Sequence, residues 1–218
     1  MQDGLVAQWD GIERGNDPAV WTDLSGNGRN WALDLANGSW TTQGLSLNGT
    51  ARVGTFVDGA PALTAADLRT VEVVYANGAG VLDTIVFVPG TDNGYYIYTD
   101  KQNHVGYYGK GNLRYGNAVS LGSTNRFNVV CGSTTVESAF VNASPRLNDG
   151  MGNYWNVGSE ASLGGLAASK PAKGEIMAIR IYNRVLTADE RLLNAKLDAI
   201  RFLGEPAPAV PGLMILLR

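Results

Sequence analysis

Hydrophobic and polar residues alternate with a period of two along most of the chain. The alternation is clearest over residues 70–75, and residues 82–88 form a more apolar run that is typical of a central strand. Turn residues such as Gly, Asn and Pro separate these runs from other short ones. We therefore predict further strands at residues 5–9, 31–35, 45–47, 52–57, 94–99, 104–108, 113–115, 126–131, 136–141, 153–157 and 175–182.

One segment near the end of the chain has the pattern of a helix. Thr187 and Glu190 form a capping box, in which each side chain satisfies a free N–H group of the first turn. Leu193, Leu197 and Ile200 then recur on one helix face. Gly204 is the residue type that ends a helix. Many short strands and a single helix predict an all-β fold, an antiparallel β-sandwich with one C-terminal amphipathic helix.

We predict one domain over residues 1–204, followed by a tail over residues 205–218. The tail begins with a stiff, proline-rich linker and ends in an apolar run. Leu213, Ile215 and Leu217 alternate along that run. They indicate a strand that needs a cover, either on an edge of its own sheet or on that of a neighbouring subunit.

Composition excludes several classes of partner. The chain has 218 residues, a formal net charge of −3 and a pI near 5.2, so it offers no basic field for nucleic acid. No run approaches the ~18 apolar residues of a membrane-spanning helix, and we expect no membrane insertion. No basic and apolar signal segment precedes the first strand pattern, and the single cysteine excludes an internal disulfide.

The sequence does not carry the residue sets of common enzymes. Glycosidases need two carboxylates facing one cleft, but Glu72, Glu137 and Glu175 each stand alone on their predicted strands. His104 is the only histidine, and neither a nucleophile elbow nor a phosphate-binding loop is present. We therefore expect that the chain is not an enzyme.

Tyrosines are concentrated in one stretch of about twenty residues. Tyr96 and Tyr98 would share one face of a strand, and Tyr107 and Tyr108 follow on the next strand. Exposed aromatic rings stack on sugar rings, so these four residues and Trp155 are candidate glycan-binding residues. The alternative is that half of the tyrosines belong to the core and the rest are ordinary surface residues.

Two motifs, taken together, resemble a known family. Residues 4–11 (GLVAQWDG) are followed by WTDLSGNG at 21–28, and residues 174–187 (GEIMAIRIYNRVLT) run into the helix. Over residues 4–203 the chain resembles the laminin-G-like domains of the concanavalin A-like lectin/glucanase superfamily, especially the bacterial and phage branch. The resemblance implies a jelly roll of two antiparallel sheets. Members of this superfamily bind glycans, proteins or each other, and some are enzymes, so the fold does not fix the function.

The resemblance also implies a structural calcium ion near the opening loop and the closing strand. Asp23 and Asn27 supply oxygen atoms of the kind that calcium prefers, and Glu175 is the nearest acidic residue on the closing strand. The usual acidic position of that strand is occupied by Met177 and Ala178. The alternative is an Asx-type turn, in which Asp23 and Asn27 bond their own backbone.

Family resemblance and the apolar tail together lead to an expectation about function. Laminin-G-like proteins without signals occur among phage virion proteins, where they decorate capsids or tails. We expect a non-catalytic surface or structural module of a virion or cell surface, which assembles with other protein subunits. The alternative is a carbohydrate-binding adhesion module whose partner is a cell-surface glycan.

Overall fold

The computed structural model describes residues 3–61, 63, 67, 69–78, 161–165 and 170–205, together with the strands between residues 84 and 147. For residue 77 and for those strands, apart from Thr124, it describes the backbone alone. All statements below concern these residues. The chain is mostly β, with antiparallel sheets and one helix, which confirms the predicted class at this level.

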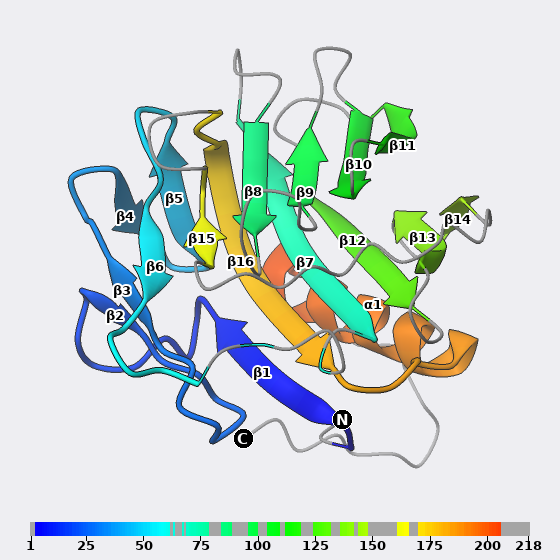
Figure 1. Ribbon diagram of the computed structural model, residues 1–218, viewed down its shortest axis with the longest axis horizontal. Coiled ribbons are helices and arrows are strands. Elements are labelled where there is room, and N and C mark those ends of the chain that lie inside the picture. Colours follow the sequence, from blue (N-terminus) through cyan, green and yellow to red (C-terminus); the bar gives the residue numbers. More distant parts are fainter. Residues whose placement is uncertain are drawn as a thin grey trace.

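The first of two eight-stranded sheets in the described part of the chain, sheet A, is centred on two long strands (Figure 1). β16 pairs with β7 on one side and with β5 and β1 on the other, and every pairing is antiparallel. The strands are β14 (Ser144–Leu147), β13 (Val136–Val141), β12 (Thr124–Cys131), β7 (Thr70–Asn77), β16 (Lys173–Tyr182), β5 (Leu45–Asn48), β4 (Gly38–Trp40) and β1 (Leu5–Asp10).

Sheet B lies in front of sheet A in Figure 1. All of its pairings are antiparallel, and its order is β11-β10-β9-β8-β15-β6-β3-β2. The strands are β11 (Asn112–Ala118), β10 (His104–Gly109), β9 (Tyr96–Thr99), β8 (Thr84–Val88), β15 (Ser162–Leu163), β6 (Gly54–Phe56), β3 (Trp31–Leu33) and β2 (Val20–Trp21).

The two sheets pack face to face around one hydrophobic core. Alternate residues of sheet A, such as Val71 and Val73, meet the completely buried Trp9 and Trp31 and the partly buried Phe56. The Trp31 and Phe56 ring centroids are 4.4 Å apart, and those of Trp9 and Trp31 are 5.5 Å apart. Aromatic rings at this spacing bury a large apolar area, and the cluster holds β1, β3 and β6 together.

A β-bulge in β16 changes which residues face the core. The register of β16 against β7 shifts between Ile176 and Ala178, so Ile176 and Ile179 both enter the core although they are three positions apart. Met177 and Ala178 instead lie together on the outer face of sheet A, where they contact Phe202. The bulge therefore provides an apolar surface against which the helix packs.

Helix α1 (Ala188–Leu203) covers that outer face. It begins with the predicted capping box and ends at Gly204 in the left-handed conformation, with φ of 66°. Its buried residues are Asn194, Asp198 and Phe202. The apolar face predicted around Leu193 is not the buried one, since Leu193 is exposed. In the described part of the chain, no helix has the length and apolar character needed to cross a bilayer.

The structure adds four short strands that the sequence pattern missed, namely β2, β4, β14 and β15. β15 lies inside the glycine-rich stretch 158–168, for which the hydrophobic pattern predicts no strand. The predicted strand at 153–157 lies outside the described residues.

Candidate functional site

The outer face of sheet B carries the tyrosine-rich strands β9 and β10 and, beyond β8 and β15, a pocket over β6 and β3. In register, Tyr98 of β9 lies opposite Gly106 of β10, Tyr96 opposite Tyr108, and Ile97 opposite Tyr107. Only the backbone of these strands is described, so the sequence prediction for the tyrosine side chains remains a prediction. Trp155, the other candidate glycan-binding residue, lies outside the described residues.

The strand register separates the four tyrosine positions into two groups. Leu163 of β15, which belongs to the core, pairs with Phe87 of β8, and Phe87 pairs with Ile97 of β9. Position 107 belongs to this core-facing row. Because successive positions of a strand belong to opposite faces, positions 96, 98 and 108 belong to the outer face of sheet B.

A pocket of about 460 Å³ lies on the same outer face, over β3 and β6. Ala32 and Thr55 form part of its floor and lie opposite each other in the β3–β6 pairing. Trp31 and Leu33, on either side of Ala32, are buried in the core, so Ala32 is on the face away from it. The remaining lining comes from the β3–β4 turn and the segment before and within β6: Asp34, Asn37, Ala51, Arg52, Val53 and Gly54.

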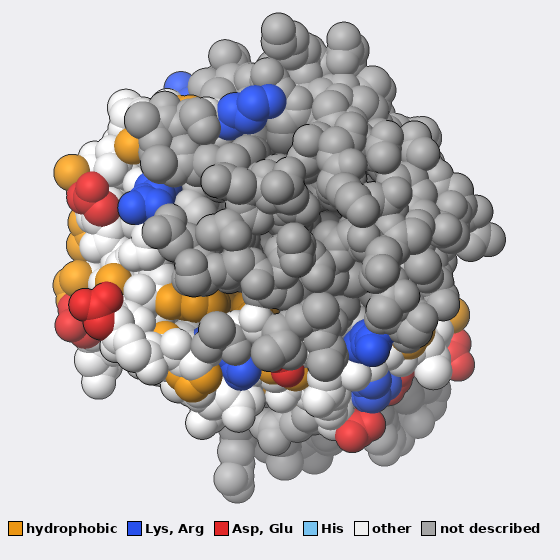
Figure 2. All heavy atoms as spheres, viewed as in Figure 1, with side chains coloured by type: hydrophobic (Ala, Val, Ile, Leu, Met, Phe, Trp, Pro, Cys, Tyr) orange, Lys and Arg blue, Asp and Glu red, His pale blue; other side chains and the backbone are white. Residues whose placement is uncertain are grey.

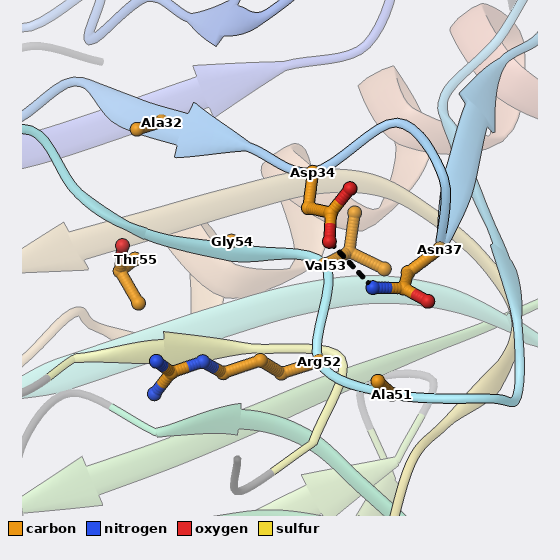
Figure 3. A pocket seen from close by; sticks show the side chains of 8 residues that line it. All are labelled: Ala32, Asp34, Asn37, Ala51, Arg52, Val53, Gly54 and Thr55. Carbon is orange, nitrogen blue, oxygen red and sulfur yellow. Dashed lines mark hydrogen bonds between the residues drawn. The ribbon is translucent and has the colours of Figure 1, made fainter. Parts of the chain in front are cut away.

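Polar groups at the rim of this pocket are held in fixed positions. Asp34 Oδ2 accepts a hydrogen bond of 2.8 Å from Asn37 Nδ2, and Asp34 Oδ1 accepts one from Ala36 N, as an Asx turn requires (Figure 3). Asn37 Oδ1 accepts a further bond from Thr50 Oγ1. These contacts order the rim without filling the pocket.

Arg52 is the basic residue in the described lining of the pocket. Its side chain is half-buried and stretched out along the side of the pocket away from the Asp34–Asn37 pair (Figure 3). The guanidinium makes no hydrogen bond or ion pair with any described residue. A guanidinium offers several donors in a fixed geometry, and these suit hydroxyl or carboxylate oxygen atoms of a ligand.

Figure 2 shows the face of the molecule on which sheet B lies. In its described part, hydrophobic, basic and acidic side chains are all visible.

The candidate calcium loop is held by hydrogen bonds. Asp23 is buried, and its carboxylate accepts from three backbone N–H groups: those of Gln8 and Ser25 on Oδ1, and that of Arg29 on Oδ2. The bond from Ser25 is the Asx turn that we considered as the alternative. Asn27 turns its amide nitrogen to Val6 O at 2.9 Å and thereby ties the loop to β1.

These residues do not fit a calcium site. The Asp23 oxygens already accept N–H groups, and the Arg29 guanidinium, which donates to Val6 O at 2.8 Å, adds a positive charge beside the same strand. Glu175 is engaged elsewhere, because its Oε1 accepts a hydrogen bond from Thr41 Oγ1. Within the described residues, no group of three acidic, His or Cys residues has the geometry to hold a metal ion.

A buried polar network that sequence reasoning did not find lies between sheet A and α1. Arg180 forms a bidentate pair with Asp198, at 2.6 and 3.0 Å, and its Nη1 lies 3.7 Å from Glu72 Oε2. Asn194 Nδ2 donates to the same Glu72 oxygen at 2.9 Å. Glu72 and Arg180 are paired in the β7–β16 register, and only the topology brings them together with the helix.

Two carboxylates, those of Asp198 and Glu72, surround the single cation of this network, Arg180. Burial lowers the pKa of the Arg180 guanidinium, but the nearby Asp198 and Glu72 carboxylates raise it by more, so Arg180 stays protonated. Glu72, a lone acid in the sequence, is thus a structural partner of a cation and is covered by the helix.

The tail residues Leu213, Ile215 and Leu217 lie outside the described residues.

No protein-family model and no curated protein matches the chain. Several solved structures share its fold. A sialidase from Trypanosoma rangeli, in complex with sialic acid, has a TM-score of 0.63 and 20% identity, over 90% of this chain and 33% of the sialidase. The chain therefore spans about a third of the sialidase's length.

Two further structures have a similar extent of likeness. Domain 4 of AbnA, a GH43 extracellular arabinanase from Geobacillus stearothermophilus in complex with arabinotriose, matches with a TM-score of 0.60 and 17% identity, over 88% of this chain and 98% of that domain. The botulinum neurotoxin serotype D binding domain matches with a TM-score of 0.68 and 8% identity, over 92% of this chain and 53% of the toxin chain. Identities this low establish a shared fold and nothing further.

Proposed function

We propose that the chain is a non-catalytic glycan-binding module with a laminin-G-like, concanavalin A-like jelly-roll fold, and that its site is the outer face of sheet B. The observation that carries the proposal is the placement of positions 96, 98 and 108 on the same face as the pocket beside Arg52. Aromatic rings and fixed polar groups on one face are a combination that suits sugar rings.

The comparisons support a glycan as ligand. The chain covers nearly the whole of the arabinanase domain, whose structure contains arabinotriose, and it matches part of a sialidase whose structure contains sialic acid. Both ligands are sugars. Because the likeness is one of fold, the identity of the glycan for this chain has to come from experiment.

The described acidic residues support binding without catalysis. Glu72 is paired with Arg180 beneath the helix, and Glu175 is bonded to Thr41 at the β4–β5 turn. In the pocket, Asp34 is the one described carboxylate, and its two oxygens are occupied by Ala36 N and Asn37 Nδ2. A glycosidase of the usual kind needs two carboxyl groups that face the same bond.

Glycan arrays and titrations would test the proposal. The full chain is screened on a glycan array and then titrated with arabinotriose, sialic acid and the strongest array ligand. We expect binding to at least one glycan, weakened about tenfold in Arg52→Ala if one charge-assisted hydrogen bond is lost. Asp58→Ala, in an exposed turn away from the pocket, is the control. Binding that Arg52→Ala leaves unchanged would place the site elsewhere, and release of a shortened glycan would refute the non-catalytic role.

A second candidate function is assembly with other protein subunits, as in a virion or on a cell surface. A specific observation favours it: α1 presents exposed leucines on the side that faces away from sheet A. Binding of glycans on sheet B and assembly through α1 use different surfaces, so both functions are compatible in one protein.

A further inference from the structure

Most of the leucines of helix α1 lie on the side of the helix that faces away from sheet A. Leu192, Leu193 and Leu203 are 45%, 48% and 49% exposed. Leu197 and Ile200 lie between them and are half-buried. At 3.6 residues per turn, all five fall within one sector of the helix surface. We call this set, Leu192, Leu193, Leu197, Ile200 and Leu203, the apolar stripe.

The opposite side of the helix explains this orientation. Asn194 and Asp198, together with Phe202, are buried against sheet A, and the two polar residues bond Glu72 and Arg180 there. If leucines covered Glu72 and Arg180 instead, these charges would be buried without polar partners from the helix, at a large cost in free energy. The polar residues of α1 are thus required for docking, and the stripe is left without a described partner.

We propose that the apolar stripe is the contact surface for a second copy of this chain, packed antiparallel about a two-fold axis near Leu192 and Leu193. This proposal deepens the assembly candidate and does not depend on glycan binding. A two-fold contact uses the same patch on both copies, so the patch must be complementary to itself.

Charges along the stripe supply that complementarity. Asp189 lies at the N-terminal end and Lys196 is seven residues later, about two turns along the same sector. Both are exposed, and neither side chain bonds another described residue. In an antiparallel pair centred between positions 192 and 193, Asp189 of each copy lies opposite Lys196 of the other.

The size of the stripe indicates a weak dimer. A stable complex of standard size buries roughly 800 Å² on each partner, and a single helix face supplies less than this. The antiparallel arrangement adds favourable alignment of the two helix dipoles and two surface ion pairs, each worth only about 0–1 kcal/mol. We expect dimers in the micromolar range of Kd or weaker.

The test is sedimentation equilibrium of the full chain over a wide concentration range at low salt. We expect a reversible monomer–dimer equilibrium whose Kd rises about tenfold or more in Leu193→Asp, since the change puts two carboxylates at the centre of the contact. The matched control is Leu35→Asp, because Leu35 is an exposed leucine of the β3–β4 turn, away from α1. Thermal melts verify that each variant is folded.

A charge exchange tests the antiparallel register itself. Asp189→Lys and Lys196→Asp should each weaken the dimer, and the double variant should restore it, because each copy then offers the reversed pair. Asp58→Lys, at an exposed site away from α1, should have no effect. Failure of the double variant to restore dimerisation would overturn the proposed register.

Other results would overturn the proposal in recognisable ways. A dimer that persists unchanged in Leu193→Asp would place the contact elsewhere on the chain. A monomer at every concentration whose melting temperature falls sharply in Leu193→Asp would show that residues of the same chain cover the stripe. A monomer whose stability is indifferent to that change would show a stripe without any partner in this protein.

Discussion

Replacing Asp198 with alanine tests whether polar contacts hold the helix on sheet A. The substitution removes two hydrogen bonds from Arg180, at 2.6 and 3.0 Å, between side chains that are 12% and 5% exposed. Removing one partner of a buried ion pair costs about 3–5 kcal/mol. Glu72 remains 3.7 Å from the guanidinium and still compensates part of its charge. We therefore expect the free energy of unfolding to fall by about 3 kcal/mol.

Urea denaturation at neutral pH measures this loss. The buried Trp9, Trp21 and Trp31 report unfolding through their fluorescence. Asp58→Ala, an acidic residue in an exposed turn, is the matched control and should change stability by no more than about 0.5 kcal/mol. A loss below about 1 kcal/mol in Asp198→Ala would refute the reasoning, because the apolar contacts of Phe202 with Met177 and Ala178 would then suffice to hold the helix.

Three further predictions concern the cap, the loop and metal ions. The Arg184 guanidinium and the Thr187 backbone lower the pKa of Glu190 from 4.5 to about 2, so the carboxylate stabilises the fold above pH 4.5 and loses this effect as the pH falls toward 2. Glu190→Gln should therefore be less stable than the wild type at neutral pH, and denaturation at falling pH should show the gap closing; a gap that widens in acid would contradict this. Asp23→Ala should lower the free energy of unfolding by about 2–4 kcal/mol, because three backbone N–H groups lose their acceptor; a loss within the ~0.5 kcal/mol of a surface change would show that water replaces it. Thermal melts should not change with chelator or added calcium, and a calcium-dependent rise that Asp23→Ala abolishes would contradict the hydrogen-bonded loop.

The helix illustrates what local sequence determines. Its ends were predictable, since the capping box at Thr187 and Glu190 and the left-handed Gly204 act through neighbouring residues only. Its orientation was not predictable, because it depends on Glu72 and Arg180, which come from two other strands. Periodicity alone predicts that the leucines face the core. The helix has the opposite orientation because its polar residues bond Glu72 and Arg180 on the sheet.

The strands also differ in whether local sequence alone predicts them. Strands with clear alternation, such as β7 and β13, were predicted, whereas β15 has two residues that pair with β6 and β8 inside a glycine-rich stretch. The candidate site was predictable in part: alternation put positions 96 and 98 on one face. Which of positions 107 and 108 shares the face of 96 and 98 required the register, and the pocket at Arg52 required the packing of the β3–β4 turn against β6.

The most direct test of the proposed function is to locate a bound glycan by backbone amide chemical shifts. The full chain is titrated with arabinotriose, sialic acid or the strongest array ligand, and the shift changes are mapped on the two sheets. Glycan binding at the outer face of sheet B predicts changes at Arg52 and Thr55 and along β9 and β10, with little change in α1. Changes confined to sheet A or α1, or no saturable change with any ligand, would contradict the proposal.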